Sequence, residues 1–212
     1  SGTIERKDGK HVVFRDYFSP NVLKPPKENF MSPVVNVYHS NIRFLDGARI
    51  PWANRVTNLA TNEEYRHTVA MLAAGYAHKG HKILVVSDRV AFLKRCAELT
   101  GDKAICVTGE IPHEEREELI NELRFGNKNV LYGTQAIFSE GISINELSCL
   151  ILGTPINNEP LLTQLIGRII RKEEDKLTPV IIDIHLNGDT ARRQASNRVG
   201  YYMKQGYEIK EL

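Results

Sequence analysis

Residues 82–99, KILVVSDRVAFLKRCAEL, contain the pattern that decides the fold. A short apolar run predicts a strand at 82–86, and after a polar turn a helix is expected near 89–99. Further strands are expected at 104–107, 129–133, 149–153 and 179–183, and further helices near 113–125 and 160–172. Apolar strands that alternate with helices indicate a parallel sheet with helices on both faces. We therefore predict an α/β fold with an open parallel sheet.

The same pattern extends upstream of residue 82. VVNVY (34–38) predicts one more strand. A helix is expected from Asn62 to His78, with Thr61 or Asn62 as its N-cap and acidic residues in its first turn.

The two ends of the chain differ from this pattern. Residues 190–205 predict a basic helix that Gly206 ends, followed by a short YEIKEL segment. The basic residues of this helix are Arg192, Arg193, Arg198 and Lys204. We expect them to face solvent rather than to contact a nucleic-acid strand. Residues 1–33 have four prolines, many charges and little periodicity, which indicates a connector. The sheet domain is therefore expected to cover 34–212.

Composition and charge narrow the class of protein. Hydrophobic residues make up 42% and charged residues 25% of the 212 residues, as in an ordinary soluble domain. No apolar run reaches the roughly 20 residues of a membrane span, so no membrane partner is expected. Cys96, Cys106 and Cys149 are too scattered for a disulfide framework or a zinc site, which favours the cytoplasm, or the host cytoplasm if the protein is viral. A net charge of +2 neither demands nor excludes a nucleic-acid partner.

The segment LTQLIGRIIRKEED (162–175) carries the most informative side chains. Wound as a helix, it places its leucines and isoleucines on one side. The opposite ridge holds Gln164, Gly167, Arg168 and Arg171. This ridge could be an ordinary solvated face. It could instead aim two guanidinium groups at a polyanion, a task that suits arginine better than lysine.

Three strand ends offer further polar groups. In open α/β sheets, such loops present ligand-binding side chains. In GTQAIFSEGISI (133–144) the candidates are Thr134, Gln135, Glu140, Gly141 and Ser143, and the alternative is an ordinary loop with a turn glycine. The strand expected at 82–86 is followed by Ser87, Asp88 and Arg89, and the strand expected at 104–107 is followed by Thr108 and Gly109. Ser87 or Asp88 is expected to cap the next helix, where Arg89 could hold a phosphate.

One segment superficially resembles a phosphate-binding P-loop. GYAHKGHK (75–82) has two glycines and a lysine, but its order is helix, loop, strand, and His81 stands before the lysine. A P-loop needs Gly-Lys-Ser/Thr between a strand and a helix. This chain is therefore not expected to bind a nucleoside triphosphate by itself, and no metal ligands are predicted.

Four of these segments resemble, in order, the C-terminal motifs of superfamily 2 helicases and translocases. ILVVSDR (83–89) resembles motif IV, VTGE (107–110) motif IVa, GTQAIFSEGISI (133–144) motif V, and the Q-x-x-G-R-x-x-R spacing of 164–171 motif VI. The resemblance covers roughly 60–185, the second RecA-like domain of that family. Ser1-Gly2-Thr3 resembles motif III, which ends the first domain and would make 4–33 the interdomain connector; Ser1 and Gly2 could also be left by cloning. The serine of EGIS and the SNRVGYYMKQGYEI tail most resemble the UvsW-type helicases of large bacteriophages.

The resemblance implies a RecA-like fold and an ATP-dependent motor made of two such domains. ATP and Mg²⁺ would be held mainly by the first domain, so this chain alone is expected to be inactive. Arg171 would be the arginine finger, with Arg168 at the γ-phosphate and Gln164 orienting the cleft or the attacking water. Glu140, Gly141, Ser143 and Gly167 would line the ATP site, although many family members have aspartate where Ser143 stands. The nucleic acid, expected to be DNA, would contact Ser87, Arg89, Thr108, Gly109, Thr134 and Gln135.

Two other classes of protein compete with this interpretation. The chain could be a non-catalytic module that binds nucleic acid or protein, which fits the missing P-loop but not the two arginines beside a glutamine. It could also be a small nucleotide-binding transferase, which would need a glycine-rich loop where VVSDR (85–89) stands.

Overall fold

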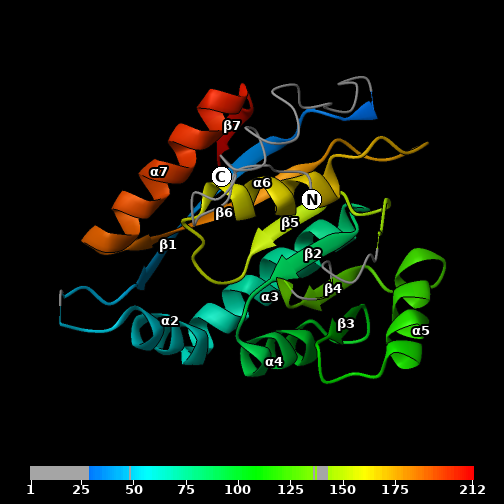
Figure 1. Cartoon of the computed structure of the whole chain (residues 1–212), viewed down its shortest axis with the longest axis horizontal. Coiled ribbons are helices and arrows are strands. Elements are labelled where there is room, and N and C mark those ends of the chain that lie inside the picture. The colour runs from blue at the N-terminus through cyan, green and yellow to red at the C-terminus, as the bar shows by residue number, and fades with distance from the viewer. Residues whose placement is uncertain (1–28, 48, 136, 138–142) are drawn as a thin grey trace, which may run out of the picture.

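The computed structural model describes residues 29–47, 49–135, 137 and 143–212. In this part of the chain, seven parallel strands form one sheet in the order β3-β4-β2-β5-β6-β1-β7 (Figure 1). The strands are β1 (Val34–Arg43), β2 (Ile83–Val86), β3 (Ala104–Val107), β4 (Val130–Gly133), β5 (Cys149–Leu152), β6 (Val180–Asn187) and β7 (Glu208–Glu211). The helices are α2 (Trp52–Thr61), α3 (Glu63–His78), α4 (Val90–Thr100), α5 (His113–Arg124), α6 (Glu159–Ile169) and α7 (Asp189–Gln205). The predicted open parallel sheet is confirmed.

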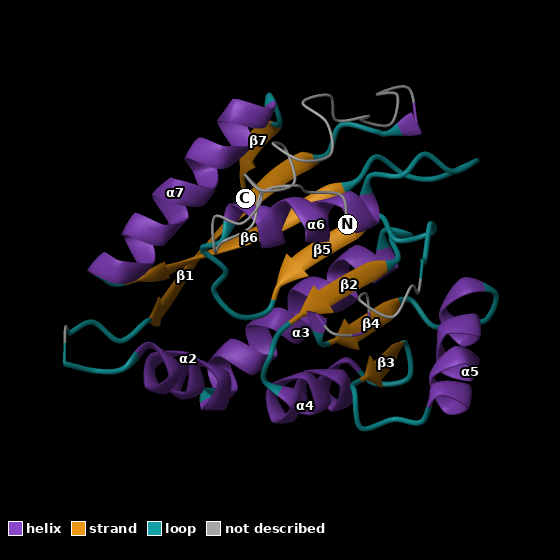
Figure 2. Cartoon of the chain, viewed as in Figure 1, coloured by secondary structure: helices purple, strands orange, loops and turns teal. Residues whose placement is uncertain are grey.

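Helices cover both faces of this sheet (Figure 2). α2, α3 and α4 share one apolar core with the first face, while α5, α6 and the end of α7 share another with the second face. In β2, Ile83 and Val85 belong to the first core, and Leu84 and Val86 to the second. Successive side chains of a strand point to opposite faces, so a strand covered on both sides is apolar at every position.

Two elements were not expected from the sequence. α2 begins after Pro51 and buries only three side chains, those of Val56, Leu59 and Ala60. β7 lies parallel to β1 at the edge of the sheet, with the pairs running from Val34 and Glu208 to Val37 and Glu211. Charged residues on an edge strand discourage pairing with other chains. Because β7 is mostly charged, it contains no apolar run from which a strand would be predicted.

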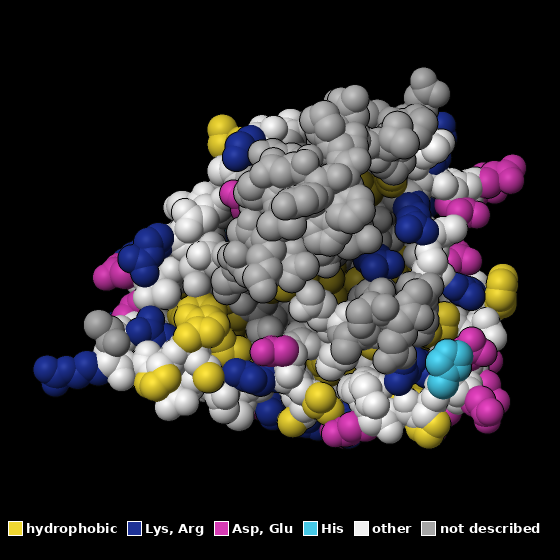
Figure 3. All heavy atoms as spheres, in the orientation of Figure 1, with side chains coloured by type: hydrophobic (Ala, Val, Ile, Leu, Met, Phe, Trp, Pro, Cys, Tyr) yellow, Lys and Arg dark blue, Asp and Glu magenta, His cyan; other side chains and the backbone are white. Residues whose placement is uncertain are grey.

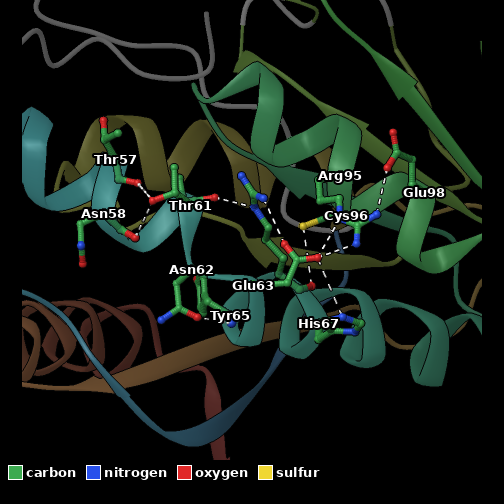
Figure 4. A network of polar contacts seen from close by, with 12 residues as sticks. Thr57, Asn58, Thr61, Asn62, Glu63, Tyr65, His67, Arg95, Cys96 and Glu98 are labelled. Atoms are coloured by element: carbon green, nitrogen blue, oxygen red, sulfur yellow. Dashed lines mark hydrogen bonds and ion pairs between the residues drawn. The ribbon is translucent and has the colours of Figure 1, made fainter.

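Asn62 separates α2 from α3 and caps the second helix. Its side chain accepts a hydrogen bond from the Tyr65 N–H at 2.9 Å, which confirms it as the N-cap. Figure 4 shows this junction beside α4, whose Arg95 donates to the Glu63 carboxylate at 2.6 Å. This contact ties the start of α3 to α4 on the first face of the sheet.

α7 ends as predicted at Gly206, which adopts a φ of 75°. However, its basic residues do not all face solvent, since Arg198 is only 6% exposed. Its guanidinium donates to both carboxylate oxygens of Asp183 in β6, at 2.7 to 3.0 Å. Burial opposes the charge of Asp183, but Arg198 and His185 outweigh it and hold the pKa of that carboxyl well below its ordinary value. The expected solvated face is therefore wrong at Arg198, because a buried carboxylate needs a paired cation.

The direction of the strands divides the loops between two edges of the sheet. The carboxyl edge holds the segments that follow the strands, including the turns after β1, β2, β3 and β4. The amino edge holds the ends of α5 and α6 and the segments that enter β4, β5 and β6. None of the helices described here is long and apolar enough to cross a membrane.

Candidate functional site

The predicted helix at 160–172 ends earlier than expected. α6 stops at Ile169, and Arg171 instead forms an antiparallel bridge with Phe30. The Ile170 carbonyl accepts from the Met31 N–H at 2.8 Å, and the Lys172 N–H donates to the Asn29 carbonyl at 3.0 Å. These bonds replace the next helical turn. The prediction that Arg171 continues the ridge of Gln164 and Arg168 is therefore wrong, because its backbone pairs with the segment that precedes β1.

The Arg171 side chain lies on the segment that enters β5, at the amino edge. Its Nη1 donates to Ser143 Oγ at 2.6 Å and to Asn145 Oδ1 at 3.3 Å. Ser143 Oγ in turn donates to Asn145 Oδ1 at 3.1 Å, and Arg124 at the end of α5 donates to the Ser143 carbonyl. These partners of the Arg171 guanidinium are neutral, and the residue is exposed. An exposed guanidinium with neutral partners keeps its charge available to an anion from outside the chain.

Lys176 holds the backbone of this arrangement. Its Nζ donates to the Arg171 carbonyl at 2.7 Å and to the Asn145 carbonyl at 2.8 Å. Burial and the nearby Arg171 charge lower its pKa to about 8, against the opposing effects of Glu173 and Glu146. Lys176 therefore joins the segment after α6 to the segment before β5.

The other polar residues of the α6 ridge lie just before Arg171. Gln164, Gly167 and Arg168 are partly exposed. Burial and the charge of Arg171 lower the pKa of Arg168, which shows that the two guanidinium groups share one electrostatic environment. A Cβ added at Gly167 would meet no heavy atom of the described residues outside its own helix turn within 4 Å, so their packing does not require glycine there. Arg168 on α6 and Arg171 just beyond the helix thus lie near a position without a side chain, Gly167.

Two predicted residues of this site, Glu140 and Gly141, lie outside the described residues. The residues that the structure describes contain no group of three or more histidine, cysteine, aspartate or glutamate side chains that could hold a metal ion. Asn145 and Lys176 were missed by the sequence analysis. Asn145 follows directly after the loop at 133–144, whereas Lys176 lies in a charged run that is typical of a solvated surface.

The residues predicted to contact nucleic acid gather at the carboxyl edge but differ in exposure. Ser87 is 2% exposed and its hydroxyl lies 3.0 Å from Thr154 Oγ1. It also accepts from the Arg89 N–H at 3.1 Å. The N-cap of α4 is Arg89, without a side-chain cap. The predicted cap by Ser87 or Asp88 is therefore wrong by one or two positions, because Ser87 Oγ bonds the N–H of Arg89 rather than one inside the helix.

Two threonines follow the same pattern at the ends of β3 and β4. Thr108 is 1% exposed, and the hydroxyl oxygens of both Thr108 and Thr134 are buried without a hydrogen-bond partner in the described structure. Gly109 and Gln135, by contrast, are exposed. Arg89 is partly exposed, with its Nη2 donating to the Ala53 carbonyl at 3.3 Å. Among the residues predicted to contact nucleic acid, Arg89, Gly109 and Gln135 are the ones that present groups to a ligand without rearrangement.

A known family matches the segment that holds most of these residues. Residues 64–173 match the family described as helicase conserved C-terminal domain, from the start of α3 through Arg171. The chain belongs to this family. The expected membership of the superfamily 2 helicases is thus confirmed.

Relatives of this helicase domain include two proteins of bacteriophages. "Probable helicase D10" of Escherichia phage T5 is 38% identical over 98% of this chain and 47% of its own length. "ATP-dependent DNA helicase uvsW" of Enterobacteria phage T4 is 24% identical over 73% of this chain and 31% of its own length. The chain thus spans less than half the length of either relative.

Solved structures agree on the fold of the helicase domain. The crystal structure of T4 UvsW matches with a TM-score of 0.67 at 20% identity, over 90% of this chain and 43% of that one. Dbp5 of S. cerevisiae, bound to RNA and ADP BeF3, matches with a TM-score of 0.59 at 13% identity, over 99% of this chain and 50% of that one. The RecA-like fold of a helicase C-terminal domain is therefore confirmed.

Proposed function

We propose that this chain is the second motor domain of an ATP-dependent helicase or translocase that acts on DNA. The observation that carries this proposal is the exposed Arg171 guanidinium, which is held by the neutral Ser143 and Asn145 and lies at the end of the family segment. A guanidinium in this setting can stabilise the negative charge that develops on a phosphoryl group in transfer. The ATP would be bound mainly by a preceding RecA-like domain with a P-loop.

The remaining residues of the amino edge have supporting roles in this proposal. Arg168 approaches the γ-phosphate beside Arg171, and Gln164 orients the cleft or the attacking water. Gly167 leaves room for the nucleotide or for the first domain, since a Cβ there meets no heavy atom within 4 Å in the part of the chain that the structure describes. Mg²⁺ would be held by residues of the first domain and would supply positive charge that offsets the charge of the phosphates.

The carboxyl edge would form part of the path for the nucleic acid. Arg89, Gly109 and Gln135 are the predicted residues that solvent reaches there. Contacts to phosphates carry no sequence information and weaken with salt. DNA is favoured as the substrate because the name of the phage T4 relative specifies a DNA helicase.

The test is ATP hydrolysis by the chain extended upstream through a complete first domain. We expect the extended protein to hydrolyse ATP and single-stranded or branched DNA to stimulate it, while the 212-residue chain alone is inactive. RNA of matched length serves as the control for the substrate. An extended protein that folds but hydrolyses no ATP would contradict the proposal and favour a non-catalytic binding module.

A further inference from the structure

The turn between β1 and α2 carries an exposed aromatic residue among arginines. Residues 43–55, RFLDGARIPWANR, contain three arginines and one aspartate. Trp52, the first residue of α2, is 43% exposed. Because this turn follows a strand, it lies at the carboxyl edge, the same edge as Arg89 and Gly109.

The Trp52 ring packs against a buried aromatic ring. Its centroid lies 5.3 Å from that of Phe44, which is fully buried at the end of β1. The two rings are tilted by 56° to each other, and a large aromatic side chain held by such a contact has little conformational freedom to lose on binding. Trp52 is therefore a preorganised platform on the surface.

The turn itself is fixed by Arg55 and Asp46. Arg55 donates to the Ile50 carbonyl at 2.9 Å, to the Gly47 carbonyl, and to Thr190 Oγ1 at 3.3 Å. The Asp46 carboxylate accepts from the N–H groups of Asp189 at 3.0 Å and Thr190 at 2.9 Å, at the start of α7. These backbone bonds, chiefly that of Thr190, lower the pKa of Asp46. The aspartate of the turn is thus engaged with the α7 terminus, which offsets its negative charge.

The other arginines of the turn are exposed to solvent. The Arg43 side chain is 75% exposed, with its Nη2 at 3.9 Å from Asp46 Oδ2, and Arg49 is exposed as well. A long contact of this kind on an exposed side chain is weak, so Arg43 can still meet a phosphate. Arg89, which follows β2, donates to the carbonyl of Ala53, next to Trp52. On the lower left of Figure 3, over the turn and α2, Lys and Arg side chains lie among hydrophobic ones. A basic surface that contains a fixed aromatic ring is the pattern of single-strand binding sites.

We propose that Trp52 stacks on a base of a single-stranded nucleic acid whose phosphates contact Arg43 and Arg49. This site extends the path at the carboxyl edge from Arg89 toward α2. It rests on the proposed function only for the nature of the ligand. Stacking on an aromatic ring is available to every base, so the site adds affinity without reading sequence.

The test uses the fact that Trp52 is the single tryptophan of the chain. The 212-residue chain is titrated at low salt with a fluorescently labelled oligothymidine of roughly 16 nucleotides, within the usual range for one single-strand site. Trp52 emission and oligonucleotide anisotropy are followed on matched samples. We expect saturable quenching of the Trp52 emission at the same concentrations that raise the anisotropy.

Variants separate stacking from packing and charge. Trp52→Leu keeps an apolar contact with Phe44 but has no π face, so binding should weaken roughly 5- to 150-fold, and Trp52→Phe should recover most of the loss. Arg49→Ala should reduce the slope of log affinity against log salt by about 0.7, the value for one phosphate of a single strand. The matched control is Phe125→Ala, which removes an aromatic residue that is 82% exposed at the amino edge and should leave binding unchanged.

Three outcomes would overturn this inference: an unchanged Trp52 emission on binding, unchanged affinity in Trp52→Leu, or no binding by the wild type. If Arg89→Ala still weakens binding while Trp52→Leu does not, the path at the carboxyl edge stands without this extension. A change in Trp52 emission on adding the upstream domain without nucleic acid, with no response to the oligonucleotide, would assign the ring to a domain interface. ATP hydrolysis by the extended protein does not depend on this site, so the proposed function is tested separately.

Discussion

Two arginine sites of this chain differ in what neutralises their charge. Between α7 and β6, Arg198 is buried and donates to both oxygens of the Asp183 carboxylate. After α6, Arg171 is exposed and bonds to the neutral Ser143 and Asn145. The first charge is paired inside the fold, whereas the second has neutral hydrogen-bond partners among the described residues and, in the function proposed above, pairs with a ligand. A paired, buried arginine therefore points to stability, and an exposed one with neutral neighbours points to function.

The largest effect on folding is expected at Arg198. Replacing it with methionine leaves the buried Asp183 carboxylate with His185 in place of its bidentate guanidinium partner, which should lower the free energy of unfolding by about 3–5 kcal/mol. Urea unfolding measures the change. The double variant Arg198→Met with Asp183→Leu should recover much of the loss, and Arg192→Met, on a side chain that is 70% exposed, should cost no more than about 1 kcal/mol. A small loss in Arg198→Met would contradict a structural role for the pair.

A smaller effect with a defined pH dependence is expected at Lys176. Its pKa is about 8 in the folded chain and near 10.5 when unfolded, so between these pH values the unfolded state binds more protons. The free energy of unfolding should therefore rise with pH across this window, relative to Lys176→Met. Because the side chain is only half-buried, we expect about 1 kcal/mol in total.

Urea unfolding at several pH values between 8 and 10.5 measures the Lys176 contribution. Lys176→Arg stays charged in the folded and unfolded states across this range, so its stability relative to Lys176→Met should not change with pH. If wild type and Lys176→Met keep a constant difference, Lys176 is not buried against Arg171 and Asn145 as described.

The smallest effect, with opposite signs for stability and activity, is expected at Gly167. Gly167→Ala should raise the free energy of unfolding by about 0.4–1 kcal/mol, because alanine favours a helix and its Cβ meets no atom here. It should also slow ATP hydrolysis by the extended protein, where the Cβ would face the bound partner. Gly75→Ala in α3, where a Cβ also meets nothing within 4 Å, should give the same stability gain with unchanged hydrolysis. Normal hydrolysis by Gly167→Ala would remove Gly167 from the site.

The sequence predicts the centre of the sheet better than its margins. β2 is apolar on both faces, so four consecutive buried residues identify it directly. β7 has one partly buried residue among exposed charged ones, and only its pairing with β1 shows it as a strand. α2 buries Val56, Leu59 and Ala60, the last two standing three and four positions after the first on one helix face, so its pattern was present in the sequence and was missed.

The candidate site was predictable by residue type but not by contact. The spacing of 164–171 marks the two arginines, yet it cannot show that the helix ends at Ile169, because the bonds that end it come from Asn29 and Met31. Likewise, Ser87 is a polar residue after a strand, and only the approach of Thr154 shows that its hydroxyl is already bonded. Side-chain roles that depend on residues distant in sequence require the fold.

The central claim is that Arg171 contacts the bound nucleotide. The ATP turnover of Arg171→Ala in the extended protein tests this claim most directly. Removing an arginine finger costs about 10³–10⁵ in rate. Because Arg171 is exposed, we expect that loss in a protein whose free energy of unfolding changes by no more than about 0.5 kcal/mol. Normal turnover in a folded Arg171→Ala protein would contradict the claim.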